Sequence, residues 1–307
     1  MGIMIFGSFA VDLTSRSHGL PRPGETLLGT SFKIGPGGKG SNQAVSAHRA
    51  GGDVTFVTKV GKDVFGQVAL DFYAGENMNT EKLLFDAELP TGTAVIMVDE
   101  ETAQNQIVFT AGACGHITPE DVEVRRADIE KADVFLGQLE INLDAMYKAV
   151  EIAHNSGAHV IVNPAPATRI PDEVLVMVDT ITPNETEAEV LTGVCVTDRE
   201  SARKAARVFF DKGVKNVIIT LGKQGVYAAD GEKEVLLPGI PVNAVDTTGA
   251  GDAFNGAFAV ALSEGKDLFE ALKFGNVAGA LSVTRAGAAP SMAKRDEIEE
   301  MYKKVYG

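Results

Sequence analysis

The sequence predicts an α/β fold, with a mainly parallel sheet covered by helices on both faces and a second, smaller β-sheet. Two observations support it. From about residue 130 onward, short apolar runs alternate with helical patterns, as in repeated strand–helix–strand units. Residues 9–34 and 91–111 break this rhythm with alternating, turn-rich sequence that shows no helical pattern. We therefore expect one domain over residues 1–307, in which these two segments form a small sheet placed as a lid.

The individual elements follow from apolar spacing. The expected strands cover residues 134–139, 160–162, 180–182, 216–220 and 225–229. The expected helices cover residues 44–49, 143–154, 185–191 and 199–212. Residues 253–262 are apolar almost all round, which predicts a buried central helix, and residues 240–245 form an extended run or strand before it. Residues 91–111 alternate around a turn, which predicts a hairpin.

Charge and composition narrow the range of partners. The chain has 28 lysines and arginines against 42 aspartates and glutamates, a net charge of −14, so we expect neither nucleic-acid nor membrane binding. The N-terminus starts as an apolar strand without the features of a signal peptide. Cys114 and Cys195 have no metal-ligand spacing and are interpreted as reduced thiols of a cytoplasmic protein. Any bound nucleotide must be held by local groups such as backbone amides, a helix N-terminus, a lysine or a divalent ion.

The run from Asp246 to Asp252, DTTGAGD, precedes the apolar helix and carries the strongest signal for chemistry. Gly249 and Gly251 can place backbone N–H groups around an anion, and the helix N-terminus adds partial positive charge. Such groups can stabilise a transferring phosphoryl group, and Asp252 can accept the proton of an attacking hydroxyl. On this stretch alone, an aspartate that merely caps the helix is the open alternative.

A second glycine-rich run, GPGGKGSNQ, covers residues 35–43. Four glycines within six residues let the backbone approach a ligand closely, and Lys39 and Asn42 add polar side chains. The run lacks the spacing of a P-loop and is not set in the strand–helix context of a dinucleotide fingerprint. It indicates either a polar ligand site or a plain loop.

Three further places put polar groups just after predicted strands. Asn184 and Glu187 lie three residues apart at the start of a helix, so they can hold Mg²⁺ directly or through water, or simply complement the helix dipole. Glu140 follows the strand at 134–139, at the end where α/β sheets bind ligands. Residues 220–225 form a glycine turn after another strand.

Taken together, these segments resemble the PfkB (ribokinase) family of carbohydrate kinases, from residue 3 nearly to the C-terminus. The motifs that carry the resemblance are Gly37–Asn42 followed by Gly51 and Gly61, and Asp246–Gly256. The resemblance implies a Rossmann-like α/β domain with a small β lid, and a homodimer paired through the lids. It also implies transfer of a phosphoryl group from ATP to a sugar. Ribose is the expected sugar, and another pentose, a ketohexose, a polyol or a nucleoside is the alternative.

The resemblance also implies a role for each site residue. Asp252 would be the catalytic base, and the anion hole would be formed by Gly249, Ala250 and Gly251. The sugar would contact Asp252 together with Asp12, Gly38, Lys39, Asn42 and Glu140. The nucleotide would be lined by Asn184, Thr220, Gly222, Gly225, Gly251 and Asn276. Glu187 would organise Mg²⁺, through water. An activating K⁺ would be held by Asp246, Thr248, Ser282, Arg285, Gly287 and Ser291, mostly through backbone carbonyls.

Two positions depart from the family pattern, and both concern the sugar. Ala10 stands where the family motif has an asparagine, and Cys114 stands where asparagine is more usual. A sugar hydroxyl that loses its amide partner costs roughly 1 kcal/mol or more. The phosphate side is intact, so phosphoryl transfer is predicted more firmly than the sugar. A non-catalytic sugar or nucleotide sensor would be expected to lack Asp252 or Gly251, and both are present.

Overall fold

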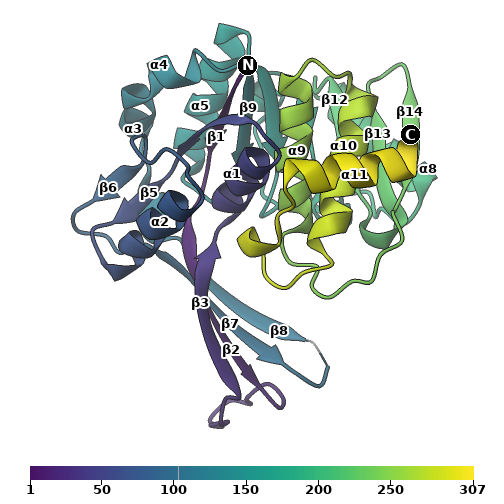
Figure 1. The fold of residues 1–307 in the computed structure, drawn as a ribbon. Helices are drawn as coiled ribbons and strands as arrows, with labels where there is room; N and C mark the ends of the chain where they lie inside the picture. The colour runs from purple at the N-terminus through teal and green to yellow at the C-terminus, as the bar shows by residue number, and fades with distance from the viewer. Residues whose placement is uncertain (103) are drawn as a thin grey trace.

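The computed structural model describes residues 1–102 and 104–307, and its largest feature is an eight-stranded sheet (Figure 1). The strand order is β14-β13-β12-β11-β10-β9-β1-β4, and all neighbours from β12 to β4 pair in parallel. Only β13 and β14 run antiparallel to their neighbours, which confirms the predicted mainly parallel sheet. The strands are β1 (Gly2–Phe6), β4 (Asp53–Val57), β9 (Val134–Gln138), β10 (His159–Asn163), β11 (Thr180–Ile181), β12 (Asn216–Thr220), β13 (Gly225–Ala229) and β14 (Glu234–Pro238).

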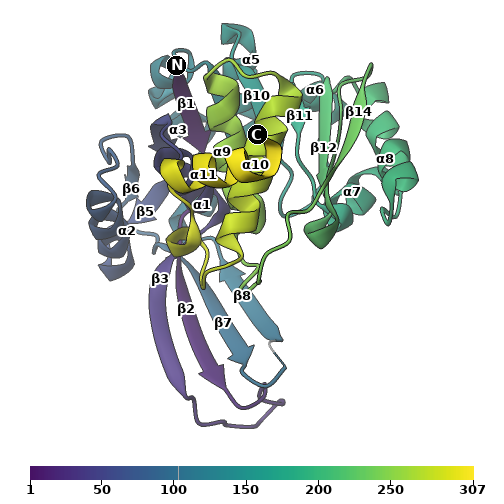
Figure 2. The same cartoon turned by 45° about the vertical axis from the view of Figure 1, so that its right-hand side comes forward.

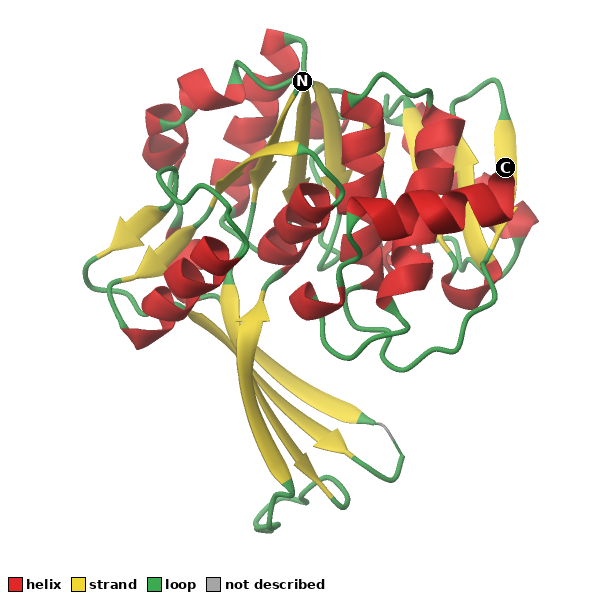
Figure 3. Ribbon diagram, in the orientation of Figure 1, coloured by secondary structure: helices red, strands yellow, loops and turns green. Residues whose placement is uncertain are grey.

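Helices cover both faces of this sheet (Figure 3). One face carries α3 (Pro119–Val124), α4 (Arg126–Ile129), α5 (Leu143–Ser156), α6 (Asp172–Leu175), α7 (Glu185–Thr192) and α8 (Arg199–Asp211). The other face carries α1 (Lys39–Arg49), α2 (Val64–Gly75), α9 (Ala250–Ser263), α10 (Leu268–Ser282) and α11 (Arg295–Tyr306). The described residues also form three short 3₁₀ helices: η1 (Gly112–His116), η2 (Gly222–Gln224) and η3 (Ala289–Ser291).

The hydrophobic core is divided in two by the sheet. In β1, Met4 and Phe6 pack with the α5 side, whereas Ile3 and Ile5 pack with the α9 side. This alternation follows from the period of two in a strand, and burial of both faces explains the nearly continuous apolar runs in the sequence. None of the helices in the described part of the chain combines the length and apolar character that a membrane crossing requires.

A second sheet projects away from the main body, as Figures 1 and 2 show from two sides. Its strand order is β3-β2-β7-β8, which confirms a small sheet built from two separate segments. The strands are β2 (Ala10–Ser17), β3 (Ser31–Gly37), β7 (Gly92–Asp99) and β8 (Asn105–Thr110). β3 extends three residues beyond the expected limit at 34, because Ala10 pairs with Gly37. The expected segment 91–111 includes residue 103, which lies outside the described residues. A further two-stranded sheet joins β5 (Lys59–Gly61) to β6 (Leu84–Asp86).

The start of α1 corrects one prediction. The helix begins at Lys39, not at residue 44, so the second half of the glycine-rich run is helical. Gly38 has φ 87°, which turns the chain out of β3 and into the helix. The first N–H groups of the helix find tertiary partners, because Lys39 N donates to Glu140 Oε2 (3.0 Å) and Ser41 N donates to the Ser8 carbonyl (2.9 Å). These bonds outweigh the weak helix propensity of the glycines.

The central helix α9 also begins earlier than the apolar pattern indicated, at Ala250. Gly249 adopts the left-handed conformation (φ 79°) and is the N-cap residue. Asp252 therefore lies inside the first turn, and the alternative that it is only a capping residue is wrong. The run 240–245 before it forms no strand and instead lies along a cleft.

Candidate active site

The site lies where the parallel strands end and α1, α7 and α9 begin, the edge at which open α/β sheets bind ligands. A hollow of about 150 Å³ is lined there by Lys39, Asn163, Ala165, Thr182, Asn184, Glu187, Thr220, Thr247, Gly249, Ala250, Gly251, Asp252 and Asn255. A larger cleft of about 580 Å³ shares Asn184, Thr220, Thr247, Ala250 and Gly251 with this hollow. The two spaces are therefore continuous around the start of α9.

Asp252 is only 7% exposed and is held by two side-chain amides. Asn42 Nδ2 donates to Asp252 Oδ2 (2.9 Å), and Gln43 Nε2 donates to Asp252 Oδ1 (2.9 Å). Burial raises the pKa of Asp252, while the charge of Lys39 and the two amide bonds act against this rise. A carboxylate whose pKa is raised is a stronger base and is better suited to accept a proton from a hydroxyl.

The three residues predicted to form an anion hole lie at the N-terminus of α9. Gly249 caps the helix, and Ala250 and Gly251 are its first two residues. Ala250 N makes a long bond of 3.3 Å to the Thr247 carbonyl. The other N–H groups of a first turn have no partner within the helix, so this end attracts negative charge. A side chain at Gly249 would crowd Ala288 at 3.1 Å, besides requiring a positive φ.

Asp12 and Glu140 form the acidic side of the site. Glu140 Oε2 accepts hydrogen bonds from Ser8 Oγ (2.6 Å) and from the Lys39 backbone N–H (3.0 Å). Burial raises the pKa of Asp12 to about 6, and the charges of Glu140 and Asp252 add to this effect. Asp12 lies against Gly37, where an added Cβ would be 2.2 Å from Asp12 Oδ1. The second sheet thus brings a carboxyl group close enough to Glu140 and Asp252 for their charges to interact.

Lys39 and Asn42 extend from α1 into the same region. Burial alone would lower the pKa of Lys39, but the charges of Asp252, Glu140 and Glu187 raise it above the ordinary value. Lys39 is therefore a positive charge inside a negatively charged hollow. The buried Asn42 Oδ1 has no hydrogen-bond partner within the described protein, so it is an acceptor available to a ligand.

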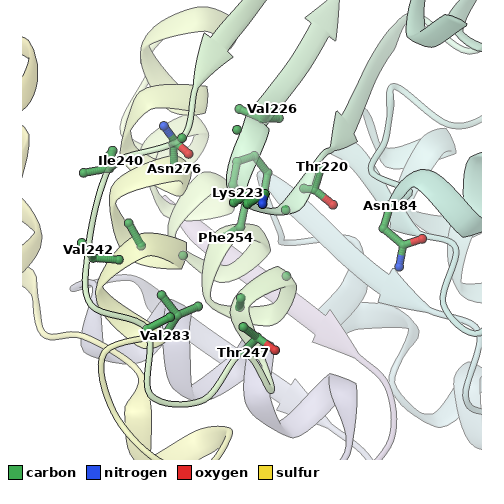
Figure 4. A pocket seen from close by; sticks show the side chains of 18 of the residues that line it. Asn184, Thr220, Lys223, Val226, Ile240, Val242, Thr247, Phe254, Asn276 and Val283 are labelled. Atoms are coloured by element: carbon green, nitrogen blue, oxygen red, sulfur yellow. The ribbon is translucent and has the colours of Figure 1, made fainter. Parts of the chain in front are cut away.

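The larger cleft is lined by both polar and apolar side chains (Figure 4). Asn184 and Thr220 lie on one side of it, opposite Ile240 and Val242. The apolar groups are Val226, Ile240, Pro241, Val242, Phe254 and Val283. All residues predicted for the nucleotide line this cleft, namely Asn184, Thr220, Gly222, Gly225, Gly251 and Asn276. The Asn276 amide donates to the Pro238 carbonyl (3.1 Å) and to Tyr306 Oη (2.8 Å).

Asn184 and Glu187 form a capping box at the start of α7. Asn184 Oδ1 accepts the Glu187 N–H and Glu187 Oε2 accepts the Asn184 N–H, both at 2.8 Å. One carboxylate oxygen of Glu187 is therefore used by the helix itself. Glu187 still lines the hollow beside Asp252, and burial raises its pKa. Within residues 1–102 and 104–307 there is no cluster of three or more acidic, histidine or cysteine side chains able to hold a metal.

The residues predicted for a monovalent cation come from two loops that meet. Asp246 accepts the backbone N–H groups of Thr248 and Gly287, both at 2.9 Å, and Asp246 N donates to the Val283 carbonyl (3.2 Å). The hydroxyls of the two predicted serines bond to carbonyls of their own segments, Ser282 to Gly279 and Ser291 to Ala288. The Arg285 side chain pairs with Glu297 on α11 and does not enter the site.

The sequence analysis missed a set of buried amides and hydroxyls behind Asp252. These residues are Gln43, Gln138, Asn163, Thr182 and Asn255, all at most 7% exposed. A signal for them existed. Gln138 ends an otherwise apolar strand, Asn163 follows the apolar run at residues 160–162, and Asn255 is a polar residue in the nearly all-apolar helix α9. A buried polar group needs a partner, so its presence in such a position points to a network.

This geometry defines a phosphoryl-transfer site for a hydroxyl acceptor, and comparisons with known proteins agree. Residues 2–295 match the family described as pfkB family carbohydrate kinase. The chain is similar to a ribokinase of Haemophilus influenzae (43% identity, 97% of each chain) and to a deoxyribokinase of Salmonella typhi (38%, 98% of each chain). It is also similar to the structure of Arabidopsis thaliana ribokinase complexed with ribose and ATP, with TM-score 0.90, 32% identity and 98% of each chain covered. The chain belongs to the pfkB family and is an ATP-dependent carbohydrate kinase, as the motifs predicted.

Proposed function

We propose that the protein transfers the γ-phosphoryl group of ATP to the primary hydroxyl, O5, of ribose, which yields ribose 5-phosphate and ADP. The observation that carries this proposal is the position of Asp252. Its carboxylate lines the hollow that is continuous with the larger cleft, and it lies close enough to Asp12 and Glu140 for their charges to interact. A sugar beside those carboxylates and a nucleotide in the cleft would meet at Asp252.

The proposed reaction follows from the charges in the hollow. Asp252 accepts the proton of the sugar hydroxyl. The hydroxyl oxygen forms a bond to the γ-phosphorus, and the bond between the γ-phosphorus and the oxygen of the ADP leaving group breaks. Negative charge grows on the phosphoryl oxygens, and the first-turn N–H groups at Gly251 and Asp252 and the Lys39 ammonium face it. These groups are fixed by the helices before substrate binds, so little reorganisation is needed.

We propose that Mg²⁺ binds together with ATP, at a site where the protein supplies only few of the ligands. Glu187 keeps one carboxylate oxygen free of the capping box, and it lines the hollow next to Asn184. Mg²⁺ commonly retains several waters and uses one or two protein oxygens plus phosphates. We propose that Glu187 holds it through water, and that Mg²⁺ neutralises phosphate charge when bound.

A K⁺ site is proposed at the meeting of the loops around Asp246 and Gly287. The residues fit a hard cation, because Asp246 supplies a carboxylate and the neighbouring turns supply backbone carbonyls. The proposed carbonyl donors are Thr248 on one side and the backbone at Ser282, Arg285 and Ser291 on the other. Burial would raise the pKa of Asp246, but backbone hydrogen bonds from Gly287 and Thr248 outweigh it and lower the pKa. A cation bound by the ionised Asp246 carboxylate would lie close to the proposed anion hole and would therefore affect turnover.

A second candidate acceptor is 2-deoxyribose, and Ala10 favours it. Ala10 is fully buried where β2 enters the second sheet, two residues before Asp12 and on the same face. A methyl group there offers no hydrogen bond to a sugar hydroxyl, so an acceptor that lacks one hydroxyl loses less binding free energy. The similarity to a deoxyribokinase of Salmonella typhi is consistent with this alternative.

The deciding experiment measures ADP release with ATP, Mg²⁺ and K⁺ against ribose, 2-deoxyribose, fructose, ribitol and a ribonucleoside. We expect the highest kcat/KM with ribose and measurable turnover with 2-deoxyribose. Turnover of fructose, ribitol or the nucleoside with neither pentose used would contradict the proposal for the acceptor. Replacement of K⁺ by a bulky organic cation tests the monovalent site, and activity should fall.

We further propose that two copies of the chain pair through the second sheet. Successive side chains alternate between its faces, so the face opposite Asp12 carries Leu13 and its register partners Ile34, Val95 and Val108. The last three side chains are 48%, 46% and 63% exposed. The same apolar face of a second copy of the chain would cover these side chains. Such pairing would also hold the second sheet in place over the sugar.

The proposed place of action is the cytoplasm. ATP is available there, and thiols stay reduced. Cys114 and Cys195 are both free thiols in this structure, which is consistent with that setting.

A further inference from the structure

Gln43 is fully buried in α1, directly behind the catalytic carboxylate. Its Nε2 donates to Asp252 Oδ1 (2.9 Å) and to Asn163 Oδ1 (3.0 Å). Its Oε1 accepts a hydrogen bond from Gln138 Nε2 (2.5 Å). One amide thus joins the first turns of α1 and α9 to the ends of β9 and β10.

The orientation of this amide is fixed by chemistry. A carboxylate only accepts hydrogen bonds, so the NH₂ group of Gln43 has to face Asp252. Both amide hydrogens are then used, and the carbonyl end faces the NH₂ group of Gln138. Rotation of Gln43 would break three buried hydrogen bonds at once, each costly to leave unmade.

The same network continues to the anion hole. Asn163 Nδ2 donates to the Thr182 carbonyl (2.9 Å), and Thr182 Oγ1 donates to Asn255 Oδ1 (2.7 Å). Asn255 Nδ2 then donates to the Gly251 carbonyl (2.8 Å). Asp252 and the peptide that precedes it are therefore fixed by one connected set of side chains, which sets the base relative to the phosphoryl group.

The two amides on Asp252 differ in what else they can do. Asn42 Oδ1 has no partner within the described protein, so Asn42 is available to a sugar as well. Gln43 has no atom left for a ligand. The charged groups around Asp252 are Lys39 from α1, Asp12 from β2, Glu140 after β9 and Glu187 from α7. Burial and the Glu140 charge disfavour the ionised form of Asp252, whereas the Lys39 ammonium and the hydrogen bonds from Gln43 and Asn42 favour it.

We propose that Gln43 is a positioning residue for the transfer reaction: it holds Asp252 ionised and turns its free lone pairs toward the acceptor hydroxyl. The proposal rests on the phosphoryl transfer proposed above, with Asp252 as base. It assigns no contact between Gln43 and substrate. It predicts that a change at residue 43 acts on kcat and on the pH profile, and leaves ATP binding intact.

The test compares three single variants of the full-length protein. Gln43→Glu keeps the shape and the acceptor for Gln138 but places a carboxylate against Asp252, and Gln43→Leu removes every hydrogen bond. Ser46→Ala is the matched control, because Ser46 lies on the same buried face of α1 and bonds the Ala253 carbonyl (2.8 Å) without touching Asp252. We expect kcat to fall about 10- to 100-fold in both Gln43 variants, with KM for ATP within about twofold of wild type.

The acidic limb of the kcat–pH profile decides between positioning and mere packing. It should move to higher pH in both Gln43 variants, further in Gln43→Glu because of the like charge, and stay in place in Ser46→Ala. An unmoved limb, or equal losses in Gln43→Leu and Ser46→Ala, would overturn the proposal. If the wild type turns over no sugar, the proposed function fails instead. Carbon-13 NMR of the Asp252 carboxyl in wild type and Gln43→Glu then tests the positioning role alone, and an unchanged titration would refute it.

Discussion

Asn42 Nδ2 lies 2.9 Å from Asp252 Oδ2, and this bond joins two residues 210 positions apart in the chain. It connects the glycine-rich start of α1 to the first turn of α9. Neither run is decisive by itself, since each has an ordinary structural explanation. Their contact around one buried carboxylate is the observation that supports the proposal that Asp252 abstracts the proton of the acceptor hydroxyl.

Asp252→Asn should abolish turnover and spare the sugar site. The amide has nearly the shape of the carboxylate but cannot accept the hydroxyl proton, and loss of a general base costs about 10²- to 10⁴-fold in kcat. Sugar binding, measured by calorimetry without ATP, should stay within about fivefold of wild type, because Asp12 and Glu140 remain. ADP release in a coupled assay is the readout.

Asp71→Asn is the matched control for this change. Asp71 is an exposed aspartate on α2, where its carboxylate accepts a hydrogen bond from Gln67 (2.7 Å). We expect wild-type turnover from Asp71→Asn. An Asp252→Asn variant with an unchanged rate would remove Asp252 as the base.

Asp12 should make sugar binding depend on pH. Its pKa is raised to about 6, first by burial and then by Glu140 and Asp252. Above this value the carboxylate accepts hydrogen bonds from sugar hydroxyls; below it the neutral acid accepts them more weakly. The KM for the sugar should therefore rise as pH falls through 6, and Asp12→Asn should show a higher KM that is flat between pH 5 and 8.

The same shift predicts the pH dependence of stability. The folded-state pKa of Asp12, about 6, lies above the ordinary value of 3.8. Its contribution to folding is thus fully present below pH 3.8 and is lost as pH rises through 6. At pH 7 the ionised carboxylate is a net cost of roughly 3 kcal/mol, so Asp12→Asn should raise the free energy of unfolding in urea. No gain at pH 7 would show that the carboxylate is better solvated than its position indicates.

The strand–helix alternation predicted the main sheet well because both of its faces are buried. Residues 216–220 and 225–229 form strands with the expected limits, since apolar runs of that length between polar turns leave few alternatives. The start of α1 was missed because its first turn depends on Ser8 and Glu140, which are distant in sequence. Local propensity in a glycine-rich run cannot register such partners.

The part of the candidate site that lies in short sequence motifs could be predicted from the sequence. The proposed anion hole, Lys39, Asn42 and Asp252 were named from glycine spacing and from the resemblance, and the structure brings them together at one end of the sheet. The buried network could not, because Gln43, Gln138 and Asn163 become neighbours only when α1, β9 and β10 pack together. The double use of Glu187, as a cap and as a group facing the hollow, also needed coordinates.

Arg49 should be a strong determinant of stability behind the site. Its guanidinium bonds both carboxylate oxygens of Glu76 (2.9 and 2.6 Å), and it donates to three backbone carbonyls, the closest that of Met292 (2.8 Å). Arg49→Ala leaves a half-buried carboxylate and these carbonyls unpaired, so we expect a loss of about 2–4 kcal/mol in urea unfolding. Arg126→Ala is the control, because Arg126 pairs with Glu123 at the exposed surface and its loss should leave the unfolding midpoint unchanged.

The proposed pairing of two copies should be sensitive to one charge on the second sheet. Val108 is 63% exposed on the face opposite Asp12, and an aspartate there would be buried against a second copy. Light scattering after size exclusion should show a dimer for the wild type and a monomer for Val108→Asp at micromolar concentration. Val124→Asp alters an equally exposed valine (68%) on α3 and should leave the dimer intact. A wild-type monomer, or dissociation by both variants, would contradict pairing through this face.

Ala10 should set the preference between ribose and 2-deoxyribose. Its neighbours in register are Gly37 and Gly92, so the adjacent strands place no side chain next to residue 10. Ala10→Asn adds an amide on the same face as Asp12, where it can bond a sugar hydroxyl that the deoxy sugar lacks. One such bond is worth about 1 kcal/mol, so the ratio of kcat/KM for ribose to that for 2-deoxyribose should rise about fivefold. Ala10→Leu has a similar shape without hydrogen-bonding atoms, and it should lower kcat/KM for both sugars without raising the ratio. Equal ratios in Ala10→Asn and Ala10→Leu would mean that residue 10 acts only through the volume of its side chain. Discrimination between the two sugars would then lie with Asp12 and Glu140.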